Sequence, residues 1–293
     1  MIAESGGVNA QRPTRIDAHH HLWRYNYDEF GWLNDSMAIL RRDFLPEDFA
    51  TELATTHVDA AIVVQSRSLL LETSFLLTCA ETSPHIVGVV GWVPLTSPDL
   101  PDILRRFCTS PHLVGFREIT QGRAAEFFGN HAFNAGIDRL AEYGLVYDIL
   151  IYADELEEAT RFVDRHPKQS FILDHAAKPH IAAGDIEPWR SQLRELSRRP
   201  NVACKLSGLV TEADWRTWTV ASLRPYLETC VEAFTPQRLI AGSDWPVCLV
   251  AGPYERWWKA LDNFFDSYTT EERDAVFGGN AQRLYPLPRQ SNI

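Results

Sequence analysis

The chain has 293 residues, 45% of them hydrophobic, and a formal net charge of −11 at pH 7, from 28 Lys and Arg against 39 Asp and Glu. An acidic surface repels the phosphates of nucleic acid and anionic membrane surfaces, so we expect neither as a partner. The length and the apolar content suit one large domain.

The five cysteines are odd in number and contain no Cys-x-x-Cys spacing. They are typical of buried free thiols in a reducing compartment rather than of a disulfide framework, so we expect a soluble cytoplasmic protein. The first 15 residues do not have the basic start and apolar run of a signal peptide, and no stretch reaches the length of a membrane span.

Residues 1–14 are small and polar with little to bury, so we expect a loose lead-in before a domain that spans residues 15–288. The domain opens with Ile-Asp-Ala-His-His-His-Leu-Trp at 16–23. On a strand, alternation places Asp17, His19 and His21 on one side and His20 on the other. Two imidazoles at i and i+2 can hold one metal ion, although a histidine-rich strand end or a purification-tag remnant would give the same letters.

The segment 24–42 is aromatic and polar without a clean period, which indicates a long loop over a site, and Pro46 suits the first turn of a helix. Beyond it, apolar runs alternate with helical patterns. The expected strands after the first are 60–65, 86–95, 113–119, 145–151, 171–175, 202–206 and 239–244. The expected helices are 72–82, 99–107, 133–143, 154–165, 186–197, 223–234, 254–265 and 271–277.

Eight strands, each followed by a helix, predict a single-domain (β/α)8 barrel of the TIM type. The alternative is an open doubly wound sheet. Such a sheet usually has a glycine-rich phosphate turn after its first strand, and histidines stand there instead.

In a (β/α)8 barrel the chemistry lies at the carboxyl ends of the strands, and every predicted strand here ends in polar or aromatic residues. His19 and His21 from the first strand, His175 from the sixth and Asp244 from the eighth form a coherent metal site. Nitrogen ligands with one carboxylate suit Zn²⁺, with Mn²⁺ or another divalent ion as an alternative. Each residue also has an ordinary interpretation: His175 as a hydrogen-bonded core histidine, and Asp244 as a helix cap.

Four ordered segments resemble the amidohydrolase superfamily (amidohydrolase-related family 2), and within it the branch of sugar-lactone and 2-pyrone-4,6-dicarboxylate lactonases. They are Asp-x-His-x-His at 17–21, Leu-Asp-His-x-x-Lys-Pro at 173–179, Cys-Lys-Leu-Ser-Gly at 204–208 and Gly-Ser-Asp-Trp-Pro at 242–246. The resemblance extends from about residue 15 to 287. It implies a distorted (β/α)8 barrel and hydrolysis of a lactone, with L-fuconolactone and L-rhamnonolactone as typical substrates.

The chain departs from this pattern on the fourth strand. Many amidohydrolases carry a carboxylated lysine there that bridges two metals, whereas this chain has Arg117 and Glu118, so we do not expect a two-metal centre. Glu118 has the opposite parity to Arg117 and would reach a metal only through a bulge. Pyrone-dicarboxylate lactonases can work without tightly bound metal, so a metal-free mechanism stays open.

The remaining strand-end residues are candidate substrate contacts. Cationic and polar side chains could hold hydroxyls or a carboxylate, and tryptophans could stack on a sugar ring, although each could equally be a structural ion pair or part of the core. The candidates are Trp23, Gln65, Trp92, Arg117, Tyr147, Asp148, Lys178, Lys205 and Trp245.

We therefore predict a lactonase in which a divalent ion on His19, His21 and His175 activates water, and Asp244 acts as the base. Arg117 or Lys178 offsets the charge that develops on the carbonyl oxygen. With few arginines at strand ends, neutral six-carbon aldonolactones should be better substrates than dicarboxylates. The rival predictions are a metal-dependent decarboxylase of the same superfamily and a non-catalytic carbohydrate-binding barrel.

Overall fold

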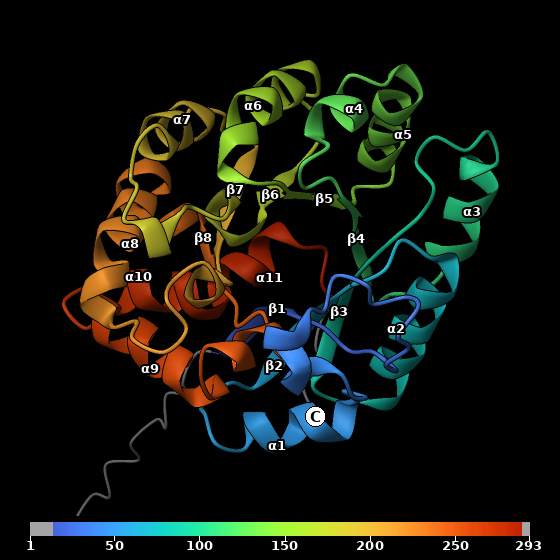
Figure 1. The fold of residues 1–293 in the computed structure, drawn as a ribbon. Coiled ribbons are helices and arrows are strands. Elements are labelled where there is room, and N and C mark those ends of the chain that lie inside the picture. Colours follow the sequence, from blue (N-terminus) through green and yellow to red (C-terminus); the bar gives the residue numbers. More distant parts are fainter. Residues whose placement is uncertain (1–13, 289–293) are drawn as a thin grey trace, which may run out of the picture.

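Eight parallel strands form one sheet in which each strand pairs with its successor in the chain, and helices surround the sheet (Figure 1). The computed structural model describes residues 14–288, so nearly all of the predicted lead-in at 1–14 lies outside the described residues. The strands are β1 Ile16–His20, β2 Ala60–Val64, β3 Ile86–Gly91, β4 Leu113–Ile119, β5 Val146–Leu150, β6 Phe171–Leu173, β7 Val202–Leu206 and β8 Leu239–Ala241. A parallel bridge between His20 and Trp245 joins β1 to the chain just after β8, which confirms the predicted (β/α)8 barrel.

The helices lie between and after the strands. They are α1 Pro46–Leu53, α2 Leu70–Thr82, α3 Leu100–Phe107, α4 Ala124–Phe128, α5 His131–Glu142, α6 Leu156–Arg165, α7 Trp189–Leu196, α8 Val220–Phe234, α9 Tyr254–Phe265, α10 Thr270–Asp274 and α11 Asn280–Leu284. The segment predicted as a loop over the site contains a short 3-10 helix at Asp35–Leu40. Within residues 14–288, no helix combines the length and hydropathy of a membrane span.

The strands are almost fully buried because helices cover them from outside and their own side chains fill the barrel, which explains their nearly continuous apolar sequences. The residues that fill the barrel are small or β-branched. They include Ala18, Val64, Val90, Val114, Val146, Ile172, Ala203 and Ile240. Two residues from the end of the described chain, Ala281 and Tyr285, belong to the same cluster. The last helix, α11, therefore contributes to the barrel interior.

Three strands end two or more residues earlier than their apolar runs predict. β3 stops at Gly91, β6 at Leu173 and β8 at Ala241, because the chain turns into loops and short 3-10 segments at the carboxyl end of the barrel. The polar residues that follow these strands consequently lie on loops. They can approach the barrel axis from several directions.

Candidate active site

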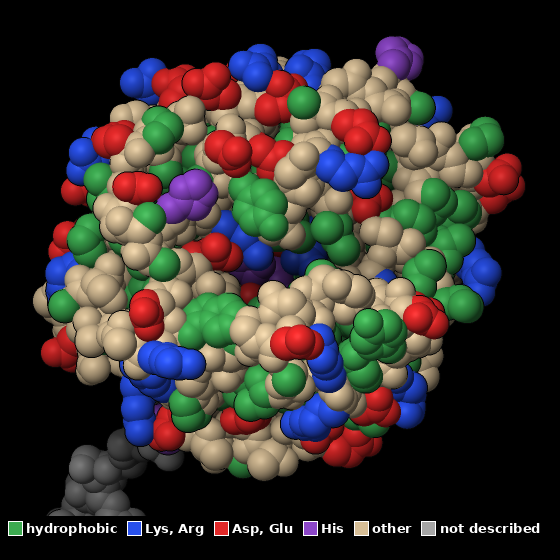
Figure 2. Space-filling model, in the orientation of Figure 1, with side chains coloured by type: hydrophobic (Ala, Val, Ile, Leu, Met, Phe, Trp, Pro, Cys, Tyr) green, Lys and Arg blue, Asp and Glu red, His purple; other side chains and the backbone are tan. Residues whose placement is uncertain are grey.

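A cavity of about 430 Å³ opens at the carboxyl ends of the strands. Figure 2 shows it as a hollow at the centre of this face, with histidine, cationic and anionic side chains at its floor. Its floor includes His21, His175 and Asp244, and its walls come from loops that follow most of the strands. The barrel therefore brings together side chains that are far apart in the sequence, in the place where (β/α)8 barrels carry their chemistry.

A bulge in β1 decides which residues of the histidine segment reach this floor. Between Asp17 and His20 the pairing of β1 with β2 shifts by one residue, so the strict alternation of side chains is interrupted. Asp17 faces α9, where its carboxylate accepts a hydrogen bond from the hydroxyl of Tyr254 at 3.0 Å. The prediction that Asp17 shares the face of His19 and His21 is therefore wrong.

Three ring nitrogens and one carboxylate oxygen converge on the floor. His21 Nε2 lies 3.3 Å from His19 Nε2 and 3.2 Å from Asp244 Oδ1. The same oxygen lies 3.7 Å from His19 Nε2 and 4.0 Å from His175 Nε2. All four side chains are at most 5% exposed. The structure thus brings together the four residues that the sequence suggested as one site.

Hydrogen bonds at the other ring nitrogens orient two of these histidines. His21 Nδ1 lies 2.8 Å from the carbonyl oxygen of Val64, which can only accept, so Nδ1 carries the proton and Nε2 has a free lone pair. His175 Nδ1 lies 2.9 Å from the Ser207 hydroxyl. In both rings it is Nε2 that faces Asp244.

Close backbone approach seats the ring of His175. Gly208 has φ +64°, and a Cβ at this position would lie 2.5 Å from His175 Nδ1. Both the left-handed backbone and the space therefore require glycine. His175 itself begins a run of four non-glycine residues with positive φ, which ends at Lys178. We call this run, residues 175–178, the left-handed turn.

The electrostatics keep His19 and His175 neutral and the carboxylate of Asp244 charged. Burial lowers the pKa of His19 well below its usual value, and burial lowers the pKa of His175 to about 4. Burial alone would raise the pKa of Asp244, but His175, His21 and His19 outweigh it and hold that pKa well below the usual range. Near neutral pH the floor therefore offers neutral imidazoles beside an ionised carboxylate.

These are the protonation states that a divalent cation requires of its ligands. In a tetrahedral zinc site with bonds of about 2.0–2.1 Å, the ligand atoms stand roughly 3.3 Å apart. The pairs that His21 Nε2 makes with His19 and Asp244 are 3.3 and 3.2 Å apart. His19, His21 and Asp244 could therefore hold one divalent ion, whereas His175 groups with His19 and Asp174. Arg117 Nη1 also lies 3.3 Å from His19 Nε2, so a guanidinium borders the same atom.

Among the predicted substrate contacts, Arg117 and Lys178 line the cavity. Arg117 is tied to Asp174 by a 2.9 Å hydrogen bond, and Lys178 Nζ lies 3.6 Å from Glu212 Oε1. Both cations therefore have an acidic partner, and the cavity carries little surplus positive charge.

The other predicted contacts do not line the cavity. Trp23 and Trp245 are buried against Phe44 behind the floor, and Tyr147 packs on Phe162 outside the barrel. Two more are held by neighbouring groups: the Gln65 amide donates to the Arg117 carbonyl, and the Trp92 indole donates to Glu118. Asp148 and Lys205 lie inside the barrel, fully buried.

Glu118 is turned away from the histidines, as its parity suggested. Its two carboxylate oxygens accept hydrogen bonds at 2.7 Å from the Ser68 hydroxyl and from the Trp92 indole. It is absent from the groups of nearby potential metal ligands in residues 14–288, which are His19, His21 and Asp244 and, separately, His19, Asp174 and His175. Glu118 therefore binds the side chains of Ser68 and Trp92 and does not lie beside Asp244.

Several residues that line the cavity were not predicted from the sequence, because they lie within loops rather than at strand ends. Trp32, Tyr152, Trp215 and Glu212 are the main ones. Trp32 belongs to the segment predicted as a loop over the site, which was the one available signal. The others carry no periodic or motif signal that separates them from surface residues.

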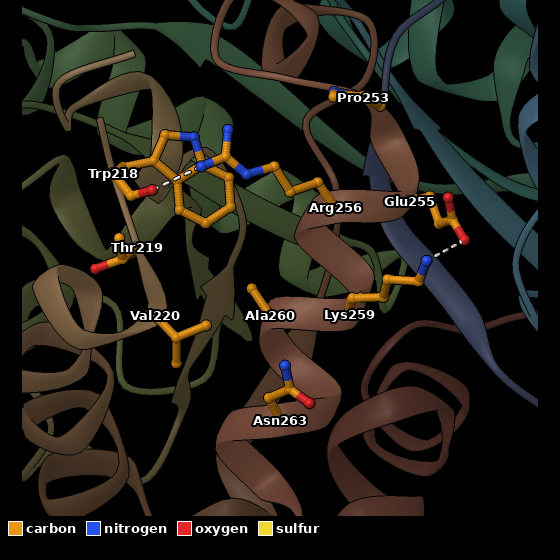
Figure 3. A pocket seen from close by; sticks show the side chains of 9 residues that line it. All are labelled: Trp218, Thr219, Val220, Pro253, Glu255, Arg256, Lys259, Ala260 and Asn263. Carbon is orange, nitrogen blue, oxygen red and sulfur yellow. Dashed lines mark hydrogen bonds and ion pairs between the residues drawn. The ribbon is translucent and has the colours of Figure 1, made fainter. Parts of the chain in front are cut away.

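A second hollow, of about 420 Å³, lies outside the barrel between α9 and the start of α8 (Figure 3). Its charged groups already have partners: Lys259 pairs with Glu255 at 2.6 Å, and Arg256 lies over the Trp218 ring and donates to the Trp218 carbonyl. Volume does not distinguish the two hollows. The convergence of histidines and a carboxylate favours the central one as the active site.

Comparisons with known proteins agree with this architecture. The L-fucono-1,5-lactonase of Burkholderia multivorans is 39% identical over 290 residues, which cover 95% of this chain and 98% of that protein. A crystal structure of an amidohydrolase from Burkholderia multivorans with bound zinc matches with a TM-score of 0.90 and 38% identity, over 94% of this chain and 100% of that one.

A probable 2-pyrone-4,6-dicarboxylic acid hydrolase from Acinetobacter baumannii matches with a TM-score of 0.75 over 92% of this chain and 98% of that one, but at 16% identity it shows the fold alone. The profile of the amidohydrolase family matches residues 16–287, which is nearly the whole described chain. The resemblance noted in the sequence is thereby confirmed, and this chain belongs to the amidohydrolase family.

Proposed function

We propose that this protein is a hydrolase that opens the ring of a sugar lactone to the corresponding sugar acid. The observation that carries the proposal is the ionised carboxylate of Asp244 at the cavity floor, surrounded by the rings of His19, His21 and His175. Relatives named L-fucono-1,5-lactonase in two Burkholderia species, at 39% and 35% identity, support it.

The chemistry follows from the positions of these groups. Asp244 accepts a proton from a water that attacks the lactone carbonyl, and it passes the proton to the ring oxygen as the carbon–oxygen bond breaks. Arg117, on the cavity wall, offsets the negative charge that develops on the carbonyl oxygen. The product is a hydroxy acid, which ionises and releases one proton per turnover near neutral pH.

We propose zinc as the cofactor, held by His19, His21, His175 and Asp244. Bound zinc in the Burkholderia multivorans amidohydrolase supports this choice. When bound, a divalent ion supplies a Lewis acid that polarises the carbonyl and lowers the pKa of water.

We propose a neutral, polyhydroxylated lactone as the substrate, such as L-fucono- or L-rhamnono-lactone. The paired Lys178 and Glu212 offer a donor and an acceptor to hydroxyl groups, and Trp32, Tyr152 and Trp215 offer flat apolar walls. A pyrone dicarboxylate would need two unpaired cations, whereas Arg117 and Lys178 each have an acidic partner.

A proton-release assay with a pH indicator tests the proposal. The purified protein would be offered L-fucono-1,5-lactone, L-rhamnono-lactone and 2-pyrone-4,6-dicarboxylate side by side. We expect the sugar lactones to give the higher kcat/KM. A clear preference for the dicarboxylate would contradict the substrate assignment, and release of carbon dioxide from an aromatic acid without lactone hydrolysis would identify a decarboxylase instead.

We also assign this activity to carbohydrate metabolism in the cytoplasm. All five cysteines are free thiols, and four of them are buried, which suits a reducing compartment. Cell fractionation would test the assignment, and recovery of the protein from an oxidising compartment would contradict it.

A further inference from the structure

A layer of charged side chains lies inside the barrel, directly beneath the cavity floor. Asp148 on β5, Lys205 on β7 and Asp174 just after β6 are each 0% exposed. Charges buried this deeply are costly unless every one of them is paired and hydrogen-bonded. The partners of these three side chains therefore indicate which neighbouring groups the layer keeps in place.

Lys205 is at the centre of this layer. Lys205 Nζ lies 2.5 Å from Asp148 Oδ2, 2.9 Å from Asp174 Oδ1 and 3.1 Å from His19 Nδ1. His19 Nδ1 also lies 3.3 Å from Asp174 Oδ1. A neutral ring whose Nε2 is free to hold a metal carries its proton on Nδ1, so Asp174 is the acceptor there and Lys205 acts on His19 through Asp174. A fixed ammonium at this point limits how the ring of His19 can rotate.

Asp148 has a second hydrogen-bond partner besides Lys205. The hydroxyl of Tyr285 lies 2.9 Å from Asp148 Oδ1 and 3.1 Å from Oδ2. Tyr285 is 2% exposed and follows α11 directly, and it packs with the residues that fill the barrel. Burial raises the pKa of Asp148 to about 6, against the effect of Lys205 and of the Tyr285 hydroxyl, so the loss of either partner would favour the neutral acid.

We propose that Tyr285 and Asp148 are positioning residues for the lactone hydrolysis proposed above: through Lys205 they fix the orientation of the His19 ring at the cavity floor. The connected set, here called the buried network, runs from Tyr285 to Asp148, then to Lys205 and Asp174, and ends at His19 Nδ1. Neither Tyr285 nor Asp148 touches the cavity. Their effect on the reaction is exerted only through Lys205.

The test compares two tyrosine-to-phenylalanine variants that each remove a single buried hydroxyl. Tyr285→Phe removes the donor to Asp148. Tyr147→Phe is the matched control, because Tyr147 is also fully buried, lies next to Asp148 on β5, and has a hydroxyl with no hydrogen-bond partner among the described residues. A merely structural role of the Tyr285 hydroxyl would lower thermal stability in Tyr285→Phe without changing kcat or the ring signals of His19.

Two measurements separate the variants. With L-fucono-1,5-lactone, we expect Tyr285→Phe to lower kcat about 3- to 10-fold with KM changed less than about twofold, whereas Tyr147→Phe leaves both near the wild-type values. In protein labelled with ¹⁵N-histidine, the ring signals of His19, assigned by their loss in His19→Gln, should shift in Tyr285→Phe and stay in place in Tyr147→Phe. The ring signals of His166, far from the buried network in sequence and bonded to Asp138, serve as an internal reference.

Asp148→Asn is the stronger variant, because an amide cannot neutralise Lys205. We expect it to lower kcat about 10- to 100-fold, in the range usual for groups that orient a metal-binding or catalytic histidine. Unchanged kcat together with unchanged His19 ring signals in Tyr285→Phe would overturn the proposal. If the wild-type protein hydrolyses no lactone, the proposed function fails, and the ring signals alone still decide whether the buried network orients His19.

Discussion

His19 and His20 are neighbours in the sequence with opposite environments. The ring of His20 stacks on Phe49 at a centroid distance of 4.1 Å, and its Nδ1 lies 3.0 Å from the Ile62 carbonyl oxygen, whereas His19 Nε2 lies beside His21 at the cavity floor. Substitution of each histidine in turn can therefore distinguish His19, the proposed metal ligand, from His20, which packs against Phe49.

We expect His19→Ala to lower the zinc content of the purified, untagged protein far more than His20→Ala does. His20→Ala should instead lower the melting temperature, because it leaves a cavity beside Phe49. Elemental analysis and thermal denaturation of both variants provide the comparison. Equal metal loss in the two variants would argue against the assigned orientations.

Asp244→Asn keeps the shape of the side chain but removes the base. We expect kcat to fall by about 10²–10⁴-fold, with a much smaller change in KM, because general base catalysis acts in the transition state. Steady-state kinetics on the preferred lactone give the answer. If turnover stayed near normal while KM rose, Asp244 would be a substrate contact, and another group would have to accept the proton.

The left-handed turn after β6 has an unusual backbone conformation. His175, Ala176, Ala177 and Lys178 have φ values of 54°, 49°, 59° and 52°, and none of them is glycine. Each such residue costs about 1–2 kcal/mol relative to a right-handed conformation. The turn places His175 at the cavity floor and Lys178 on its wall, so the strain is stored beside the site.

In this turn a glycine substitution should relieve backbone strain, whereas in a right-handed helix it usually lowers stability. Ala177→Gly and Ala159→Gly, the latter in α6, both remove a fully buried methyl group, but glycine relieves strain in the first and weakens a right-handed helix in the second. We expect Ala159→Gly to lower the free energy of unfolding by about 2 kcal/mol more than Ala177→Gly. Denaturant unfolding of both variants measures the difference. Equal destabilisation would mean that the turn stores no strain.

An ion pair between α6 and the chain after α7 gives a pH-dependent contribution to stability. Arg199 donates to both carboxylate oxygens of Asp164 at 2.9 Å, and this pairing lowers the pKa of Asp164. A lowered carboxyl pKa stabilises the fold above the unfolded value near 3.8 and loses that effect as the pH falls through the folded value.

We expect Arg199→Gln to lower the melting temperature at pH 7 by about 2 °C, since the pair is partly exposed. The difference from the wild-type protein should shrink below about pH 4. Thermal melts at pH 7 and pH 3.5 test the sign. A difference that is the same at both pH values would show that Arg199 acts by packing rather than by its charge.

The barrel and the four residues that converge at the cavity floor could be predicted from the sequence, whereas the bulge in β1 and the positions of the other site residues could not. Eight apolar runs with polar ends are a strong signal, because the strands are buried on both faces. The bulge after Asp17 has no signature in the letters, so simple alternation misplaced that residue. Trp23 and Trp245 look like sugar platforms at strand ends, yet both are buried against Phe44, since the loop 24–44 folds back over them.

The distribution of charge over the molecule supports a neutral substrate. The chain has a net charge of −11, and the cations that line the cavity are paired with acids, Arg117 with Asp174 and Lys178 with Glu212. A neutral lactone meets no long-range repulsion from this negative charge, whereas the ionised product is repelled by it, which favours release.

The closure of the barrel by β1 and the chain after β8 has a consequence for folding and exchange. His21 and Asp244 are 223 positions apart in the sequence and lie on the two sides of that junction, where His21 N donates to the Trp245 carbonyl at 2.6 Å. Contacts of such large sequence separation carry a high loop-closure cost, which slows folding. A ligand that binds both residues therefore connects the first strand to the last, and amide hydrogens along this junction should exchange more slowly when the site is filled.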